Sequence, residues 1–424
     1  MGGTQSKKWV LLAAGSEGWI NYRHQACVCH AYQMAHGNGI PDEQIVVMMY
    51  DDIANNEANQ NHRGEIINEP GGPNVYQGVL KDYINNDVSV QNFLAVLRGD
   101  EANVTKHAGG PKKVLKSGRN DTIFIYLSGH GGKGVFAFPN TNTLHASDLV
   151  DTINEMSGRH QFSKMVIYVE SCFSGSMIDH LPKNTEVYGV SASSPDESSY
   201  AYFLDEDRWA YLSNEFTAYW LLHNEKSDLT KTTFWNQFVY LREKVQRSTP
   251  HQYGNITLRE LYISDFLGRP DSRTQAERAR QAKRLKQTHL TLTNEVPLII
   301  QRSRIQCENN IEKKRALQRD YDNLMKMKER IATAVQNIAM QSCPERGPRA
   351  LIDTSRLTQL KHLKHVAEHF RQTFSKWHEE QYVSFVMAHM SVFVNLIESG
   401  VDVERIKDAI TRVHIAQGPS SGRY

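Results

Sequence analysis

Short apolar runs separated by polar turns fill the part of the chain before residue 270. Five of these runs have the length and continuous hydrophobicity of buried parallel strands, and they cover residues 9–15, 45–50, 122–127, 164–170 and 187–192. Apolar residues at helical spacing cover residues 22–37, 145–157, 213–224 and 228–248. Strands that alternate with helices predict an α/β fold with a mostly parallel, doubly wound sheet.

The pattern changes after about residue 270. Residues 272–288 are polar and compatible with a helix, and residues 289–304 predict an extended or loop segment that contains Pro297. Helical periodicity then covers residues 308–340, 353–375, 379–398 and 402–414, and no strand is expected there. We therefore expect an α/β domain at 1–271, a linker at 272–309 and an all-α helical domain at 310–424.

Charge is distributed unevenly between these parts. Residues 1–271 contain 23 basic and 31 acidic side chains, a net charge of −8, whereas residues 272–424 contain 26 and 16, a net charge of +10. Opposite charges predict that the two parts attract each other. Nucleic acid is not expected as a partner of the basic part, because no stacking-aromatic signature accompanies the charge.

The chain is not expected to span a membrane, because no run approaches the roughly 18 apolar residues that a transmembrane helix needs. Residues 1–8 also lack the apolar core of a signal peptide. The sequence as it stands is therefore that of a cytosolic protein, or of a secretory-pathway protein from which a signal peptide has been removed.

The five cysteines, an odd and sparse number, do not predict a disulfide framework. Cys27 and Cys29 fall inside a helical pattern, where their thiols point about 200° apart. No second pair of ligands completes a metal site. We therefore expect small buried helix residues at these positions, and neither a metal nor another cofactor.

Three chemically active side chains follow elements of the predicted sheet. His130 stands between glycines after one strand, Cys172 follows another strand, and Asn21 follows the first. Ligands of parallel sheets bind at the carboxyl ends of the strands, so a thiol and an imidazole there suit nucleophilic catalysis. A buried, inert cysteine with a histidine in a turn is the alternative, but the glycine-rich turns after both strands favour catalysis.

Several motifs resemble one family of peptidases. Ser-Gly-His-Gly-Gly at 128–132 and Glu-Ser-Cys at 170–172 are similar to the histidine and cysteine elements of caspase-like cysteine peptidases. Residues 14–26 and 39–52 resemble the legumain (asparaginyl endopeptidase) family within that group, as do shorter matches at 75–79, 92–100 and 197–200. The resemblance extends to about residue 265 and continues more weakly into the tail, which is similar to the legumain prodomain.

The resemblance implies a caspase-like fold and a cysteine peptidase that cleaves after Asn and, at lower pH, after Asp. Cys172 would be the nucleophile, His130 the general base and acid, and Asn21 the residue that orients His130. The backbone N–H groups of Gly131 and Cys172 would form the oxyanion hole. The S1 pocket would be formed by Arg23, His24, Glu170, Ser199 and Asn214.

The S1 residues fit the recognition of a primary amide, which needs donors at its oxygen and acceptors at its NH2 group. Arg23 supplies donors and Glu170 an acceptor. An ionised Asp would be repelled by Glu170, whereas a protonated Asp imitates Asn, so cleavage after Asp is expected only in acid. A simple ion pair between Arg23 and Glu170 is the alternative interpretation.

The resemblance also implies a zymogen, with residues of about 310–424 covering the active site as an inhibitor. Acid would protonate carboxylates on the negative side and weaken the attraction, and self-cleavage after Asn309 or Asn310 would make release permanent. Expected partners are protein and peptide substrates, the chain's own prodomain and cystatin-type inhibitors. The family implies a lysosomal or vacuolar compartment, or secretion.

Several positions depart from the family pattern. Asn214 and Phe173 stand where legumains carry Asp and Glu, Gly129 replaces an Asp, and only Cys343 remains where the prodomain has two disulfides. Gly129 is closer to the GPI transamidase, so a transpeptidase of that kind is one alternative, although the legumain-like tail and the missing membrane anchor argue against it. A weakly active or inactive binding protein is another, against which the intact Asn21, His130 and Cys172 argue.

Overall fold

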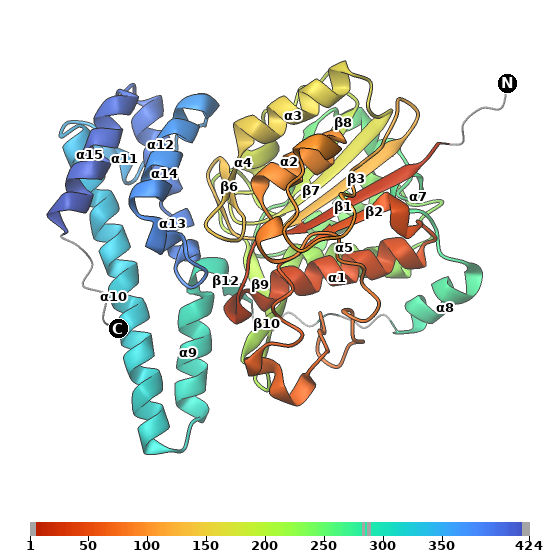
Figure 1. The fold of residues 1–424 in the computed structure, drawn as a ribbon, viewed down its shortest axis with the longest axis horizontal. Coiled ribbons are helices and arrows are strands. Elements are labelled where there is room, and N and C mark those ends of the chain that lie inside the picture. The colour runs from red at the N-terminus through yellow and green to blue at the C-terminus, as the bar shows by residue number, and fades with distance from the viewer. Residues whose placement is uncertain (1–5, 282–284, 286–289, 418–424) are drawn as a thin grey trace.

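A six-stranded sheet forms the centre of the α/β part of this computed structural model, which describes residues 6–281, 285 and 290–417 (Figure 1). The strand order is β11-β8-β7-β3-β1-β2, and β11 alone runs antiparallel to its neighbour. The strands are β1 (Lys8–Ala14), β2 (Ile45–Met48), β3 (Thr122–Ser128), β7 (Lys164–Glu170), β8 (Val187–Ser191) and β11 (His251–Gly254). The prediction of an α/β fold with a mostly parallel sheet is confirmed.

Helices cover both faces of this sheet, which explains why its strands are apolar at nearly every position. The face shared by Val10, Leu12 and Tyr126 packs against one layer of helices, and the face shared by Leu11, Ala13 and Ile125 packs against the other. The first layer comprises α1 (Tyr22–Gly37), α5 (Glu215–Lys226), α6 (Phe234–Lys244) and α7 (Ser264–Leu267), and the second comprises α2 (Val90–Arg98), α3 (Ala146–Gly158) and α4 (Gly175–Ile178).

Two small antiparallel sheets lie beside the carboxyl ends of the parallel strands. One has the order β4-β5-β6 and the other the order β10-β9-β12. Their strands are β4 (Gly131–Gly132), β5 (Val135–Ala137), β6 (Thr143–His145), β9 (Tyr200–Asp205), β10 (Ala210–Asn214) and β12 (Thr291–Leu292). Strand β4 begins directly after His130, and β9 begins directly after Ser199, whose backbone N–H donates to Cys172 Sγ, so both sheets border the expected active site.

Helix α8 (Ser272–Gln281) lies against α5 of the α/β part, and the helices that follow it form a second body beside that part (Figure 1). They are α9 (Val296–Cys307), α10 (Ile311–Ser342), α11 (Gly347–Ala350), α12 (Leu360–Thr373), α13 (Val383–Met387), α14 (Met390–Glu398) and α15 (Val403–Ala416). Helices α10 to α15 share a hydrophobic core that includes Phe370, Trp377 and Phe393. No helix in the described part of the chain is long and apolar enough to cross a membrane.

Two expectations about the linker and the tail are wrong in part. Residues 289–304 were expected to form an extended or loop segment; β12 is extended, but most of the segment forms helix α9. Pro297 lies in the first turn of α9, where a helix does not use the backbone N–H that proline lacks. The single helix expected over 379–398 is divided into α13 and α14 by a turn at Ala388 and His389, and both helices contribute to the helical core.

The two bodies meet through apolar contacts and a few polar ones. An added Cβ on Gly132 would lie only 2.6 Å from the Met387 carbonyl oxygen, so the helical body touches the β4 backbone directly. Lys364 of the helical body pairs with Asp148 of the α/β part at 2.7 Å, which agrees with the predicted attraction between a basic and an acidic body. In the pair of Glu368 and His145, also at 2.7 Å, the acidic residue instead belongs to the helical body. Packing therefore contributes to this interface alongside charge.

All five cysteines are free, so the helical body has no disulfide to stabilise it. We expect Phe370→Ala, in a Cys172→Ala background that prevents self-cleavage, to lower the free energy of unfolding of this body by about 3–5 kcal/mol. Phe370 is fully buried against Phe374, Trp377 and Phe393. Urea denaturation followed by circular dichroism measures the change.

Ile352→Ala is the matched control, because Ile352 is 80% exposed and its loss is expected to change stability by less than about 0.5 kcal/mol. Equal effects of the two substitutions would contradict the packing account. Adding a reducing agent is expected to change neither result.

Candidate active site

Residues from several elements converge beyond the carboxyl ends of β1, β3 and β7. Asn21 ends a 3-10 turn (Trp19–Asn21) that leads into α1, and Arg23 and His24 lie in the first turn of α1. His130 lies between β3 and β4, and Cys172 follows β7 by two residues. Parallel strands bring these positions together because their carboxyl ends lie at one edge of the sheet.

His130 is held through one of its two ring nitrogens. Its Nε2 lies 2.7 Å from Asn21 Oδ1, and Asn21 Nδ2 donates to the Glu17 carbonyl at 2.9 Å. Because Asn21 Oδ1 can only accept, His130 Nε2 carries the proton and donates it. Nδ1 of His130 is buried without a partner, so its lone pair is available as a base.

The environment of His130 favours the neutral imidazole. Burial lowers its pKa well below 6.5, and the positive charge of Arg23 lowers it further. His24 packs edge-on against His130 with the ring centroids 4.8 Å apart, and a 2.6 Å contact to Ser16 Oγ fixes His24 Nδ1. His24 therefore supports the His130 ring by packing.

Cys172 and His130 line the same small cavity, together with Gly131 and Phe173. The backbone N–H of Ser199 donates to Cys172 Sγ at 3.3 Å. An added Cβ on Gly131 would lie 2.3 Å from the Cys172 carbonyl oxygen, so only glycine permits this approach of the two backbones. A thiol and an imidazole with a free lone pair therefore line one cavity.

A second group of side chains forms a buried polar pocket next to the thiol. Arg23 Nε donates to Asn214 Oδ1 at 3.0 Å, while both Nη atoms of Arg23 and Nδ2 of Asn214 are buried without partners. Glu170 Oε2 accepts bonds from the backbone N–H and the hydroxyl of Thr217, at 3.1 and 3.0 Å, while Oε1 has no partner.

Burial opposes charge on both residues of this pocket. It lowers the pKa of Arg23 to about 10 and raises the pKa of Glu170 to about 8. None of the ion pairs found in the described residues joins Arg23 to Glu170, so the simple ion-pair interpretation is wrong. Unpaired donors and an unpaired acceptor instead remain available in one buried place, which is the pattern of a site that recognises a polar group.

The cavity is closed by two other parts of the chain. Thr293 and Asn294 of the linker, and Ser384, Met387 and Ala388 of the helical body, complete its lining. About 10 Å³ of it is open, close to the least volume that accommodates one water molecule. No local signal could have placed these residues, because each comes from a region far away in the sequence.

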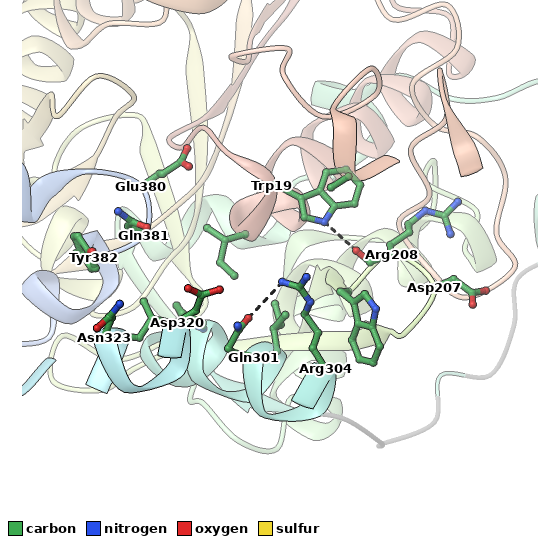
Figure 2. Close-up of a pocket in the computed structure, with 16 residues that line it drawn as sticks. Trp19, Asp207, Arg208, Gln301, Arg304, Asp320, Asn323, Glu380, Gln381 and Tyr382 are labelled. Carbon is green, nitrogen blue, oxygen red and sulfur yellow. Dashed lines mark hydrogen bonds between the residues drawn. The ribbon is translucent and has the colours of Figure 1, made fainter. Parts of the chain in front are cut away.

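Two larger clefts, of about 560 and 750 Å³, lie elsewhere and do not include Cys172. Figure 2 shows the first, where Trp19 and Arg208 of the α/β part lie near Gln301 and Arg304 of α9. Choosing a candidate site by volume alone would miss His130 and Cys172, because they lie in the small covered cavity.

The remaining sequence predictions concern metals and processing. In the described ranges no three His, Cys, Asp or Glu side chains are grouped so that they could bind a metal ion, and Cys27 and Cys29 are buried in α1, as expected. Asn309 and Asn310 are exposed between α9 and α10, where Asn310 caps α10 through a bond from the Lys313 N–H. They are not among the residues that line the cavity, and their exposure leaves them open to another molecule.

The raised pKa of Glu170 makes a prediction about stability. Relative to 4.5 for the free side chain, a folded-state pKa of about 8 means that the folded protein prefers the protonated form. The resulting stability is complete below about pH 4.5 and is lost as the pH rises through about 8. In a Cys172→Ala background, Glu170→Gln should lose less unfolding free energy than its parent between about pH 5 and pH 8.5.

Urea unfolding at the two pH values measures this difference. The exposed Glu312→Gln is the control, and it should leave the pH dependence of the parent unchanged. Superimposable pH profiles for Glu170→Gln and the parent would show that the Glu170 carboxyl does not take up a proton on folding.

Known proteins provide an independent comparison. Residues 8–269 match the model of the Peptidase C13 family. The chain is 40% identical to legumain from Bos taurus and 41% identical to legumain from Homo sapiens, each over 96% of this chain and 93% of the relative. It is also 33% identical to the vacuolar-processing enzyme delta-isozyme of Arabidopsis thaliana, over 95% of this chain and 89% of the relative.

A caspase-1 structure from Spodoptera frugiperda aligns with 63% of this chain and 92% of its own, at a TM-score of 0.34 and 9% identity, which is too distant to support an argument. The family match covers more than half of the chain, and the relatives cover nearly all of it. The chain belongs to the Peptidase C13 family and is a cysteine endopeptidase.

Proposed function

We propose that the chain cleaves peptide bonds with Cys172 as the nucleophile, His130 as the general base and acid, and Asn21 as the residue that orients His130. The observation that carries this proposal is the hydrogen bond between His130 Nε2 and Asn21 Oδ1. It commits one ring nitrogen to Asn21 and leaves Nδ1 free in the cavity that Cys172 also lines.

The reaction follows from these positions. His130 Nδ1 takes the thiol proton as Cys172 Sγ attacks the substrate carbonyl carbon, and the backbone N–H groups of Gly131 and Cys172 stabilise the oxyanion. The imidazolium then protonates the leaving amine, and an acyl-enzyme remains. Water, deprotonated by the same His130 nitrogen, releases the acid product and restores the thiol.

The polar pocket supports a preference for Asn. The Arg23 Nη atoms and Asn214 Nδ2 can donate to the amide oxygen, and Glu170 Oε1 can accept from the amide NH2 group. A substrate that lacks this amide leaves buried polar atoms unpaired, which costs binding free energy. Protonated Asp presents a similar pattern, so cleavage after Asp belongs to acidic conditions.

The covered cavity supports synthesis as an inactive precursor. In this proposal residues 1–271 are the peptidase domain, 272–309 the linker and 310–424 an inhibitory prodomain. Met387 contacts the backbone of Gly132, and Thr293 contacts Ser199, so a substrate cannot reach Cys172 while both segments remain in place. Cleavage after the exposed Asn309 or Asn310 by another molecule separates linker from prodomain.

In this proposal, acid weakens the overall charge attraction between the α/β part and the helical body, but it does not break every contact between them. Burial alone would raise the pKa of Glu368, but hydrogen bonds from His145 and Arg371 lower it to about 2. The bond between His145 and Glu368 therefore persists in mild acid, and cleavage is needed for lasting release. Such a precursor suits an acidic compartment such as a lysosome or vacuole, or secretion.

Substrate preference provides the first test. Processed enzyme is expected to hydrolyse an Ala-Ala-Asn fluorogenic peptide at about pH 5, and Cys172→Ala should reduce kcat by at least about 10⁴-fold. The matching Ala-Ala-Asp peptide should be cut at about pH 5 and resist at pH 7, and Ala-Ala-Gln should resist at both. Equal rates on the Asn and Gln peptides would refute the proposed pocket chemistry.

Latency provides the second test. A full-length Asn309→Gln/Asn310→Gln precursor should hydrolyse the Asn reporter at pH 7 at least about 100-fold more slowly than processed enzyme, the ratio expected when capped molecules outnumber open ones by about 100 to one. Fluorescence with added processed enzyme as a standard measures the ratio. Full activity at neutral pH with an intact tail would rule out the inhibitory role.

A further inference from the structure

The linker crosses the active site as a β-strand. Thr291 and Leu292 of β12 pair antiparallel with Ala201 and Tyr200 of β9. Thr293 continues this pairing, because its N–H donates to the Ser199 carbonyl at 3.2 Å. An extended peptide that adds to an open sheet edge in this way is held by main-chain bonds, while its side chains enter pockets. The linker thus marks a path that a substrate could follow.

Ser199 shows how this strand is aligned with Cys172, because it contacts both. The Ser199 N–H donates to Cys172 Sγ at 3.3 Å, and the Ser199 carbonyl accepts from Thr293. Ser199, which directly precedes β9, therefore connects the thiol to Thr293, and Thr293 also lines the cavity with His130 and Cys172. The Thr293 backbone thus pairs with the residue that contacts the thiol.

Thr293 does not satisfy the polar pocket. Its hydroxyl donates to the Ser199 carbonyl at 3.0 Å, while the free atoms of Arg23 and Glu170 stay unpaired. The next residue, Asn294, has the amide that the pocket lacks, but its Oδ1 is also buried without a partner. The strand would thus have to shift by one residue to bring the Asn294 side chain into the pocket.

We infer that the linker is a substrate strand held one residue out of register, with Thr293 at the cleavage position and Asn294 as a second, internal processing site. This inference rests on the proposed preference for Asn. A shift by one residue moves the strand by about 3.3 Å and turns each side chain to the other face, so the intact linker is both bound and protected.

Helix α9 holds the register. It begins at Val296, two residues after Asn294, and Val296 and Ile300 pack in an apolar cluster with Ala201 and Tyr211. Glu295 also forms an ion pair with Lys328 of α10. Cleavage after Asn309 or Asn310 cuts the connection between α9 and α10, removes the covalent part of this restraint and allows the strand to shift.

The second cleavage then follows the same chemistry. The bond between the Asn294 carbonyl carbon and the Glu295 nitrogen breaks as Cys172 Sγ forms a thioester with Asn294. His130 gives the proton taken from the thiol to the new Glu295 amine, and water hydrolyses the thioester. The products are a carboxylate on Asn294 and a free amine on Glu295, and α9 leaves the groove.

The test uses full-length precursor with Asn309→Gln and Asn310→Gln, so that the first cleavage is blocked. At about pH 5 this parent should keep its linker intact, whereas adding Thr293→Asn should produce a cut after residue 293 at a rate that does not depend on protein concentration. Thr293→Val is the matched control of similar shape without an amide, and it should remain intact. Intact-mass spectrometry locates each cut.

A second measurement uses chains in which Asn309 and Asn310 are present. Cleavage after 309 or 310 should come first and cleavage after Asn294 second, and Asn294→Gln should abolish only the second. The free nonapeptide of residues 290–298, which no helix restrains, should be cut after Asn294 by processed enzyme.

The outcomes separate this inference from the proposed function. If processed wild-type enzyme cuts Ala-Ala-Asn but the Thr293→Asn linker stays intact, the register assignment is wrong and the Asn preference stands. A cut after Asn294 in the blocked parent would also overturn it, because the linker would then be in register already. If Ala-Ala-Asn itself resists, both proposals fail.

Discussion

The hydrogen bond between His130 Nε2 and Asn21 Oδ1 is the contact on which the chemistry of this molecule depends. It joins residues beyond the ends of β1 and β3, two strands that are neighbours in the sheet. Since Asn21 uses its own NH2 group on the Glu17 carbonyl, its oxygen must accept, and the tautomer of His130 is decided. The parallel sheet thus sets the protonation of one ring, and Nδ1, which is buried without a partner, keeps its lone pair free.

The polar pocket beside the thiol lowers the stability of the folded protein. Buried donors and acceptors without partners typically cost about 1–3 kcal/mol each, and Arg23, Glu170 and Asn214 all contribute such atoms. Burial raises the pKa of Glu170 to about 8, so its carboxyl is neutral at pH 7 and avoids the cost of a buried negative charge, whereas Arg23, with a pKa of about 10, keeps its charge. A substrate amide that pairs with these atoms recovers free energy that the folded protein has already given up, and this difference is the physical source of the proposed specificity.

The helical body covers the site without disulfides and with few direct ion pairs. Its contact with Gly132 depends on the absence of a side chain, and its core is built from aromatic and aliphatic residues such as Phe370 and Phe393. Glu380 of the same body lies against Gly18, and burial together with Asp52 and Glu17 raises its pKa. The expectation that opposite net charges attract therefore describes only the long-range field, while local contacts combine packing with pairs of both polarities.

Much of the fold could be read from the sequence. Continuous apolar runs predicted the strands, because a sheet covered on both faces needs apolar residues at every position, and the glycine-flanked His130 and strand-end Cys172 indicated the site, because parallel strands deliver their ends to one edge. Helix α9 and strand β12 could not be read from the sequence. Thr291 and Leu292 form a strand only because the edge of β9, about 90 residues earlier, offers unpaired backbone groups. Tertiary structure alone decided which residues of the linker and the helical body cover Cys172, because a short polar segment such as Thr293–Asn294 has no local signal of its partner.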